Sequence, residues 1–158
     1  MFRNLTRIKQ QLSREDCIHL LKTEPRGVLS VLGDDGYPYA LPMDHWYNEE
    51  DGCLYFHSGN QGHKVDAMKA CPKVCFCVYD QGYREEGDWA LNIKSVIVFG
   101  RVEFVEDPED AIRITRLLSF KYTSDAAYIE EEIRKYSSGL LCFRLIPEHM
   151  TGKITKES

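Results

Sequence analysis

The sequence lacks a long apolar run, an excess of basic residues and any repeated or low-complexity segment. No stretch approaches the roughly 20 apolar residues of a membrane-spanning helix, so we expect no membrane partner. The net charge of −5 argues against nucleic-acid binding, because such binding depends on Lys and Arg side chains that neutralise phosphates. The basic N-terminus has no apolar signal-peptide core, and we therefore expect a cytoplasmic protein. A chain of 158 residues without a linker is expected to form a single domain spanning residues 1–158.

Cysteine pairs of the kind that bind zinc are also missing, although the chain has six cysteines. Cys71, Cys75 and Cys77 lie close together in the sequence, but a structural zinc site needs four ligands and usually includes a Cys-x2-Cys pair. In the cytoplasm, free thiols are expected rather than disulfides. We therefore expect reduced cysteines and no metal site.

Apolar alternation and turn signals predict a mainly β protein with flanking α-helices. Strands are expected over residues 27–32, 37–47, 53–57, 73–79, 94–105 and 140–146, and helices over 13–24, 62–70, 107–122 and, less clearly, 125–134. We interpret the acidic run at 128–132 as a solvated helix face. Pro38 and Pro42 cannot donate ladder hydrogen bonds, so their strand should lie at a sheet edge or bulge beside a ligand. Gly100 predicts a bulge in the longest strand. Six or seven such strands in hairpin succession close most easily into a small antiparallel barrel.

Residues 36–64 carry the clearest functional signal. Two aromatic-rich strands precede a small polar loop, Ser58-Gly59-Asn60-Gln61-Gly62-His63-Lys64. Glycines let backbone N–H groups approach an anion, and Lys64 supplies positive charge. The helix macrodipole disfavours a lysine at a helix N-terminus unless an anion is bound there. The loop and its strands therefore fit a planar ring that carries a phosphate tail.

Six short motifs in a fixed order cover nearly all of the chain. They are Gly27-Val28-Leu29-Ser30, Asp35-Gly36-Tyr37-Pro38-Tyr39-Ala40-Leu41-Pro42, Tyr55-Phe56-His57-Ser58, Gly62-His63-Lys64, Ser95-Val96-Ile97-Val98-Phe99-Gly100-Arg101 and Thr151-Gly152-Lys153. On these motifs the chain resembles the FMN-binding split-barrel family that includes pyridoxamine 5'-phosphate oxidase, and within it the nitroimidazole-resistance (Nim-type) branch. The resemblance implies an antiparallel split β-barrel and a homodimer with two flavins at the subunit interface.

The resemblance also implies which residues form the flavin site. The isoalloxazine ring would lie along Leu41, Pro42, Met43 and Asp44, and the ribityl phosphate would be held by His57, Ser58, Gly62, His63 and Lys64. The partner subunit would add Trp89 and Ser95. His57 is the expected catalytic residue, as a donor that stabilises charge developing on the flavin or the substrate. The arginine-rich pattern of the vitamin-making oxidase is absent, so pyridoxamine phosphate is a poor substrate candidate.

The activity implied is that of a flavin-dependent oxidoreductase of the nitroimidazole-reductase type. A reduced nicotinamide or another donor would reduce FMN, which would pass electrons to a small acceptor such as a nitro compound or quinone. FAD in place of FMN stays open. Two other functions also stay open. One is a flavin carrier or sensor without strong catalysis, and the other is a haem-binding protein with His57, His63 or His149 as axial ligand.

Overall fold

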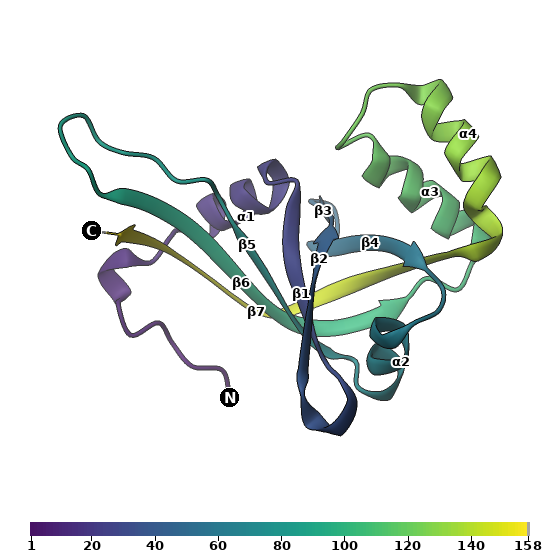
Figure 1. The fold of residues 1–158 in the computed structure, drawn as a ribbon, viewed down its shortest axis with the longest axis horizontal. Helices are drawn as coiled ribbons and strands as arrows, with labels where there is room; N and C mark the ends of the chain where they lie inside the picture. The colour runs from purple at the N-terminus through teal and green to yellow at the C-terminus, as the bar shows by residue number, and fades with distance from the viewer. Residues whose placement is uncertain (158) are drawn as a thin grey trace.

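The computed structural model describes residues 1–157, which form one antiparallel sheet of seven strands with four flanking α-helices (Figure 1). The strands are β1 (Arg26–Leu32), β2 (Pro38–Asp44), β3 (Trp46–Asn48), β4 (Cys53–Gly59), β5 (Lys73–Tyr79), β6 (Leu91–Phe104) and β7 (Leu140–Glu157), and the helices are α1 (Arg14–Thr23), α2 (His63–Ala70), α3 (Pro108–Ser119) and α4 (Ala126–Tyr136). The strand order β2-β1-β5-β6-β7-β4-β3 curls into a half-barrel. The predicted antiparallel split barrel is confirmed.

The split in the barrel lies between β2 and the end of β4. β2 and β3 stand at opposite ends of the strand order, yet only His45 separates them in the sequence, so the sheet must curl to join them. β3 pairs with Cys53–Tyr55 of β4, whereas the remainder of β4 pairs with β7 alone among the described strands. β2 pairs only with β1 in the described residues, which confirms the edge position predicted from Pro38 and Pro42.

β6 and β7 form a long two-stranded arm that extends beyond the barrel (Figure 1). The sequence predicts that the last strand ends at residue 146, but β7 continues to Glu157, which pairs with Leu91. The polar tail stays extended because β6 supplies ladder partners along its length, a long-range effect that local propensity does not reveal. The register shifts between Phe99 and Gly100, which confirms the predicted bulge. A Cβ atom on Gly100 would lie 2.1 Å from the carbonyl oxygen of Ile146, so no larger residue fits.

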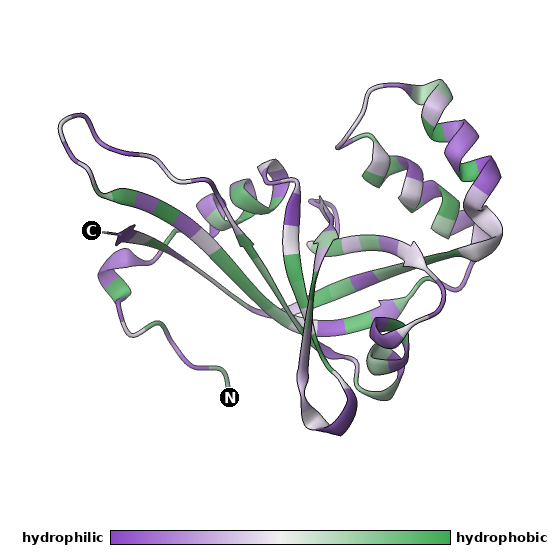
Figure 2. Cartoon of the chain, in the orientation of Figure 1, coloured by the Kyte–Doolittle hydropathy of each residue, from purple (hydrophilic) through white to green (hydrophobic). Residues whose placement is uncertain are grey.

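Three fully buried phenylalanines form the centre of the barrel core. The Phe56 ring stacks on Phe143 and meets Phe76 edge-on, with centroid distances of 5.0 Å in both pairs. Hydrophobic and hydrophilic residues alternate along the strands, as Figure 2 shows. On β5, this alternation buries Val74, Phe76 and Val78 and leaves Cys75 and Cys77 together on the other, partly exposed face. Because Phe56 immediately precedes His57, the packing of its side chain in the core fixes the position of the end of β4.

The α3–α4 hairpin lies beside β4 and β7, outside the barrel (Figure 1). Ala111 and Ile114 of α3 pack in a second apolar cluster with Cys53, Tyr55 and Cys142 of these strands. Arg116 of α3 forms an ion pair with Glu130 of α4 and joins the two helices. The hairpin thus stands next to the end of β4, where the predicted site begins. None of the helices within residues 1–157 combines the length and apolar character needed to cross a bilayer.

Candidate functional site

The loop after β4 presents unpaired donors where an anion was predicted to bind. Gly62 begins α2 with a φ of +114°, a conformation that L side chains rarely adopt. The N–H groups of Val65 and Asp66 donate to the Gly62 carbonyl, at 3.0 and 3.1 Å. Those of His63 and Lys64 have no acceptor in the described chain. The half-buried Lys64 ammonium likewise has no ion-pair partner among residues 1–157. Free N–H groups and an unpaired cation at a helix N-terminus can hold a phosphate.

The side chains of His63 and Ser58 hold this loop in place. The Asp34 N–H donates to His63 Nε2 at 3.4 Å, and the His63 ring stacks on Tyr39 with a centroid distance of 4.2 Å. His63 therefore ties α2 to the β1–β2 turn and offers a ligand chiefly its backbone. The Ser58 hydroxyl donates to the Gly59 carbonyl at 2.8 Å and retains the ability to accept a hydrogen bond.

The predicted ring wall lies on the free edge of β2. Leu41 and Asp44 are half-buried and Pro42 is exposed, whereas the Met43 side chain is 8% exposed and packs in the barrel core. Met43 can therefore face a ligand only through its backbone. Asp44 forms an ion pair with Arg26 of the neighbouring strand, with Nε and Oδ1 2.6 Å apart. The wall thus combines small apolar surface with one paired carboxylate.

A buried polar cluster that the sequence did not reveal holds the corner between β2 and β3. His45 is completely buried, and its Nε2 lies 2.7 Å from the Leu21 carbonyl of α1. The Lys121 ammonium donates to the carbonyls of Glu24 and His45, at 2.7 and 2.9 Å. The Tyr122 hydroxyl accepts from the His45 N–H at 2.8 Å. The cluster therefore joins α1, the end of α3 and the residue that follows Asp44.

Burial shifts the titration of both basic groups in this cluster. Burial, with a smaller contribution from the nearby Lys121 charge, lowers the pKa of His45 to about 4. It also lowers the pKa of Lys121 to about 8, against the opposing effect of the Asp44 and Glu24 carboxylates. His45 is therefore neutral at pH 7 and serves the corner as a hydrogen-bonding group rather than a charge.

His57 stands at the split, within the electrostatic reach of Asp44 on the opposite strand. His57 is exposed to solvent on one side, but neighbouring atoms desolvate its imidazole and lower its pKa below the ordinary value, and the Asp44 carboxylate acts in the opposite direction. The imidazole is consequently neutral at pH 7, with one nitrogen able to donate and the other able to accept. The structure thus brings together predicted residues from β2 and β4 that the sequence separates.

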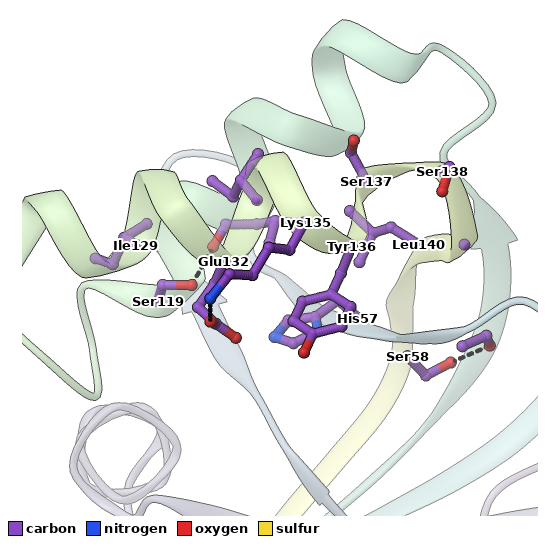
Figure 3. Close-up of a pocket in the computed structure, with 14 residues that line it drawn as sticks. His57, Ser58, Ser119, Ile129, Glu132, Lys135, Tyr136, Ser137, Ser138 and Leu140 are labelled. Atoms are coloured by element: carbon purple, nitrogen blue, oxygen red, sulfur yellow. Dashed lines mark hydrogen bonds and ion pairs between the residues drawn. The ribbon is translucent and has the colours of Figure 1, made fainter.

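A cavity of about 600 Å³ opens on the α3–α4 side of His57 and Ser58. Figure 3 shows Tyr136 projecting from α4 toward His57, with the ion pair of Lys135 and Glu132 to one side. The wall also contains groups from α3, from the 3-10 turn Ser137–Gly139 and from the start of β7, namely Thr115, Ser119, Ser137, Ser138, Gly139 and Leu140. The sequence did not predict this cavity. The one available signal was the apolar pair Ile129 and Ile133, whose i, i+4 spacing gives the polar helix a buried side.

Trp89 and Ser95 do not join the other predicted site residues within one chain. Trp89, which is 72% exposed, lies in the loop between β5 and β6, at the far end of the long arm from α2 (Figure 1). Ser95 pairs with Tyr79 and Lys153 in the body of the arm.

The three histidines considered as haem ligands lie in different surroundings. His57 lies at the split, His63 is stacked on Tyr39, and His149 is stacked on Phe2 with a centroid distance of 4.9 Å. No group of three or more His, Cys, Asp or Glu side chains within the described part of the chain is arranged to hold a metal ion. All six cysteines are free thiols.

These features fit the flavin that the family resemblance implies. The phosphate would meet Lys64 and the free N–H groups of α2, which are unpaired donors, and the Ser58 hydroxyl would donate to it after turning from the Gly59 carbonyl. The unpartnered edge of β2 offers backbone groups to a flat ring.

Comparison with known proteins agrees with the fold. The family model described as "Pyridoxamine 5'-phosphate oxidase" matches residues 13–154. A candidate 5-nitroimidazole antibiotic resistance protein from Bacteroides thetaiotaomicron superposes with a TM-score of 0.76 at 20% identity, over 93% of this chain and 87% of that one. An FAD-binding protein from Mesorhizobium loti gives a TM-score of 0.65 at 26% identity, over 92% and 97%. An FAD and heme binding protein from Mycobacterium smegmatis gives 0.74 at 19% identity, over 92% and 73%. No curated protein matches the sequence.

Proposed function

Because the chain belongs to the pyridoxamine 5'-phosphate oxidase family, we propose that it binds FMN and transfers electrons from the reduced flavin to a small acceptor such as a nitro compound. One observation carries the proposal. Lys64 stands without an ion-pair partner in residues 1–157, beside the free N–H groups at the start of α2 and at the end of a strand that borders the barrel split. An unpaired, half-buried cation in that setting favours a bound anion.

The protein's part in this function is to bind and orient the cofactor. Lys64, Ser58 and the backbone at Gly62 and His63 would hold the phosphate, and Leu41, Pro42 and Asp44 would form the wall beside the ring. When bound, the flavin would supply the redox chemistry. The tail of an FAD would have to extend beyond this loop, so FMN is the simpler fit.

His57 is proposed to act on the reacting groups through a hydrogen bond. Its imidazole is neutral at pH 7 and lies at the split between the phosphate loop and the cavity. A neutral imidazole can donate from one nitrogen toward an oxygen on which negative charge develops. Asp44, which raises the His57 pKa, would tune the strength of that donor.

A second copy of the chain would complete the site. Trp89 and Ser95 lie on the long arm, away from α2 of the same chain, and the exposed indole has room to contact another subunit. A homodimer in which the arm of one protomer reaches the flavin of its partner would use both residues. The nitro acceptor is supported by the fold shared with the candidate 5-nitroimidazole antibiotic resistance protein, and a reduced nicotinamide is the proposed donor.

The test is a visible spectrum of the purified protein, followed by heat release and chromatography of the bound compound. Flavin absorbance with released FMN is the expected result, in a protein that elutes at about twice its chain mass of 18.3 kDa. Oxidation of NADH that depends on an added nitro compound would then distinguish an enzyme from a flavin carrier. A colourless protein that takes up no added flavin would contradict the proposal, and a Soret band would identify a haem protein instead.

A further inference from the structure

The cavity beside His57 has the size and the apolar floor of a small-molecule site. Ile129, Ile133 and Leu140 line it, and its volume of about 600 Å³ lies within the roughly 300–1,000 Å³ usual for ligand pockets. Ile129 is 2% exposed, so the floor belongs to the packed body of the hairpin. The cavity is therefore a formed feature of the folded chain.

The charges on the cavity wall cancel one another. Lys135 is held by Glu131 at 3.0 Å and by Glu132 at 3.6 Å, and Glu132 itself lines the cavity (Figure 3). His57, the other basic group on the wall, is neutral at pH 7. An anion that entered would lose its hydration without meeting a free cation, which disfavours its binding.

A few polar groups on the wall can orient a ligand. Thr115 is 7% exposed, and its Oγ1 is buried without a hydrogen-bond partner in the described residues. The Ser119 hydroxyl donates to the Thr115 carbonyl at 2.8 Å, and Tyr136 carries its hydroxyl toward His57 (Figure 3). Such groups match the few polar contacts that fix orientation in an otherwise apolar pocket.

We propose that this cavity binds a neutral, flat organic molecule of one or two rings that carries a hydrogen-bond acceptor such as a nitro or quinone oxygen. The lack of a free cation disfavours a dinucleotide, whose phosphates suit the Lys64 side of β4 instead. Because His57 and Ser58 belong to both surfaces, the occupant would lie directly beside the proposed flavin. That it accepts the flavin's electrons rests on the proposed function, whereas its binding does not.

The experiment uses two probes of equal size and different charge, neutral 4-nitrobenzyl alcohol and anionic 4-nitrobenzoate. Each is titrated into isotopically labelled full-length protein at pH 7.5, with and without FMN, and binding is followed by NMR shifts of backbone amides. We expect the neutral probe to shift residues of α4 and the end of β4 in both samples. The anionic probe should bind at least about tenfold more weakly.

Two tyrosines on α4 provide a matched pair of variants. Tyr136 lines the cavity and Tyr128, on the same helix, does not; both side chains are exposed, at 64% and 54%. Tyr136→Ala should weaken binding of the neutral probe about three- to tenfold, the effect of one aromatic contact, and Tyr128→Ala should leave it unchanged. Neither variant removes a group proposed to hold FMN, so FMN binding should be the same in both.

Three results would overturn the proposal. One is equal binding of the two probes, the second is equal behaviour of the two tyrosine variants, and the third is loss of the probe's shifts when FMN is added. The last result would mean that the flavin itself fills the cavity. A protein that binds the neutral probe but no flavin would contradict the proposed function and still support the proposed cavity ligand.

Discussion

The two surfaces that meet at the end of β4 differ in whether their lysine side chains have ion-pair partners. On the loop side, Lys64 has no ion-pair partner in residues 1–157 and stands beside free backbone donors. On the cavity side, Lys135 is neutralised by two glutamates and stands above an apolar floor. An unpaired cation favours an anionic ligand, whereas a cation already paired with carboxylates attracts it less. The contrast therefore separates the proposed phosphate site from the proposed neutral-ligand site, which lies only a few residues away.

The largest effect on both surfaces is expected from a substitution in the barrel core that supports them. Phe56 is fully buried and packs on Phe76 and Phe143, directly before His57. Phe56→Ala should lower the free energy of unfolding by about 3–5 kcal/mol, through lost burial and the cavity it leaves. Urea denaturation measures the effect. Leu32→Ala, at a strand position that is 50% exposed, should cost less than about 1 kcal/mol, and equal losses would contradict the packing argument.

Acid should weaken both surfaces through the corner that closes the barrel. The pKa of His45 is about 4 in the folded chain, whereas its ordinary value, which applies to the unfolded chain, is 6.5. The unfolded state therefore binds more protons across this window, and stability falls as pH drops from 6.5 toward 4. The difference of 2.5 pH units corresponds to about 3 kcal/mol.

His45→Gln should remove that part of the acid sensitivity, as measured by urea denaturation at pH 7, 5.5 and 4.5. Glutamine can still donate to the Leu21 carbonyl but cannot gain a proton. The control is His19→Gln, because His19 is exposed on α1. The control should lose stability in acid as the unaltered protein does. If His45→Gln lost just as much, the buried histidine would not be the acid-sensitive group.

The sequence predicts the loop surface well because that surface is local. Gly62 and Lys64 follow a strand within one short segment, and Pro38 and Pro42 mark the edge strand without reference to any other part of the chain. The same local reasoning ended the last strand at residue 146, because only pairing with β6 keeps the polar tail extended to Glu157.

The cavity surface escaped prediction because it is assembled from distant segments. Thr115 and Tyr136 line one cavity with His57 only because α3 packs beside β4 and α4 packs on α3. The acidic run at 128–132 is solvated as predicted at Tyr128, Glu130 and Glu131, yet Ile129 between them is buried. Likewise, no feature of the sequence around Lys121 predicts that its ammonium donates to the carbonyls of Glu24 and His45.

Lys64→Ala should sharpen the contrast by affecting one surface alone. Loss of a charge-assisted contact should weaken FMN binding by about 1.5–3 kcal/mol, measured by fluorescence titration of flavin-free protein. Lys69→Ala, at the other end of α2 and exposed, should leave FMN affinity unchanged. Binding of neutral 4-nitrobenzyl alcohol in the cavity should be the same in both variants. Unaltered FMN affinity in Lys64→Ala would remove this lysine from the phosphate site.

The smallest expected effect concerns His57, the residue shared by both surfaces. Its pKa is lowered by partial desolvation and raised by the Asp44 carboxylate, so Asp44→Asn should lower the pKa further. The imidazole Cε1–H resonance, followed by NMR against pH, reports this directly. Glu49→Gln is the control, because Glu49 is an exposed carboxylate paired with Lys22 and does not act on His57. An upward shift in Asp44→Asn would mean that the carboxylate does not reach His57 across the split. A downward shift in that variant alone would establish that Asp44 on β2 acts electrostatically on His57 on β4. The edge strand would then set the pKa of the histidine that lies between the two proposed ligands.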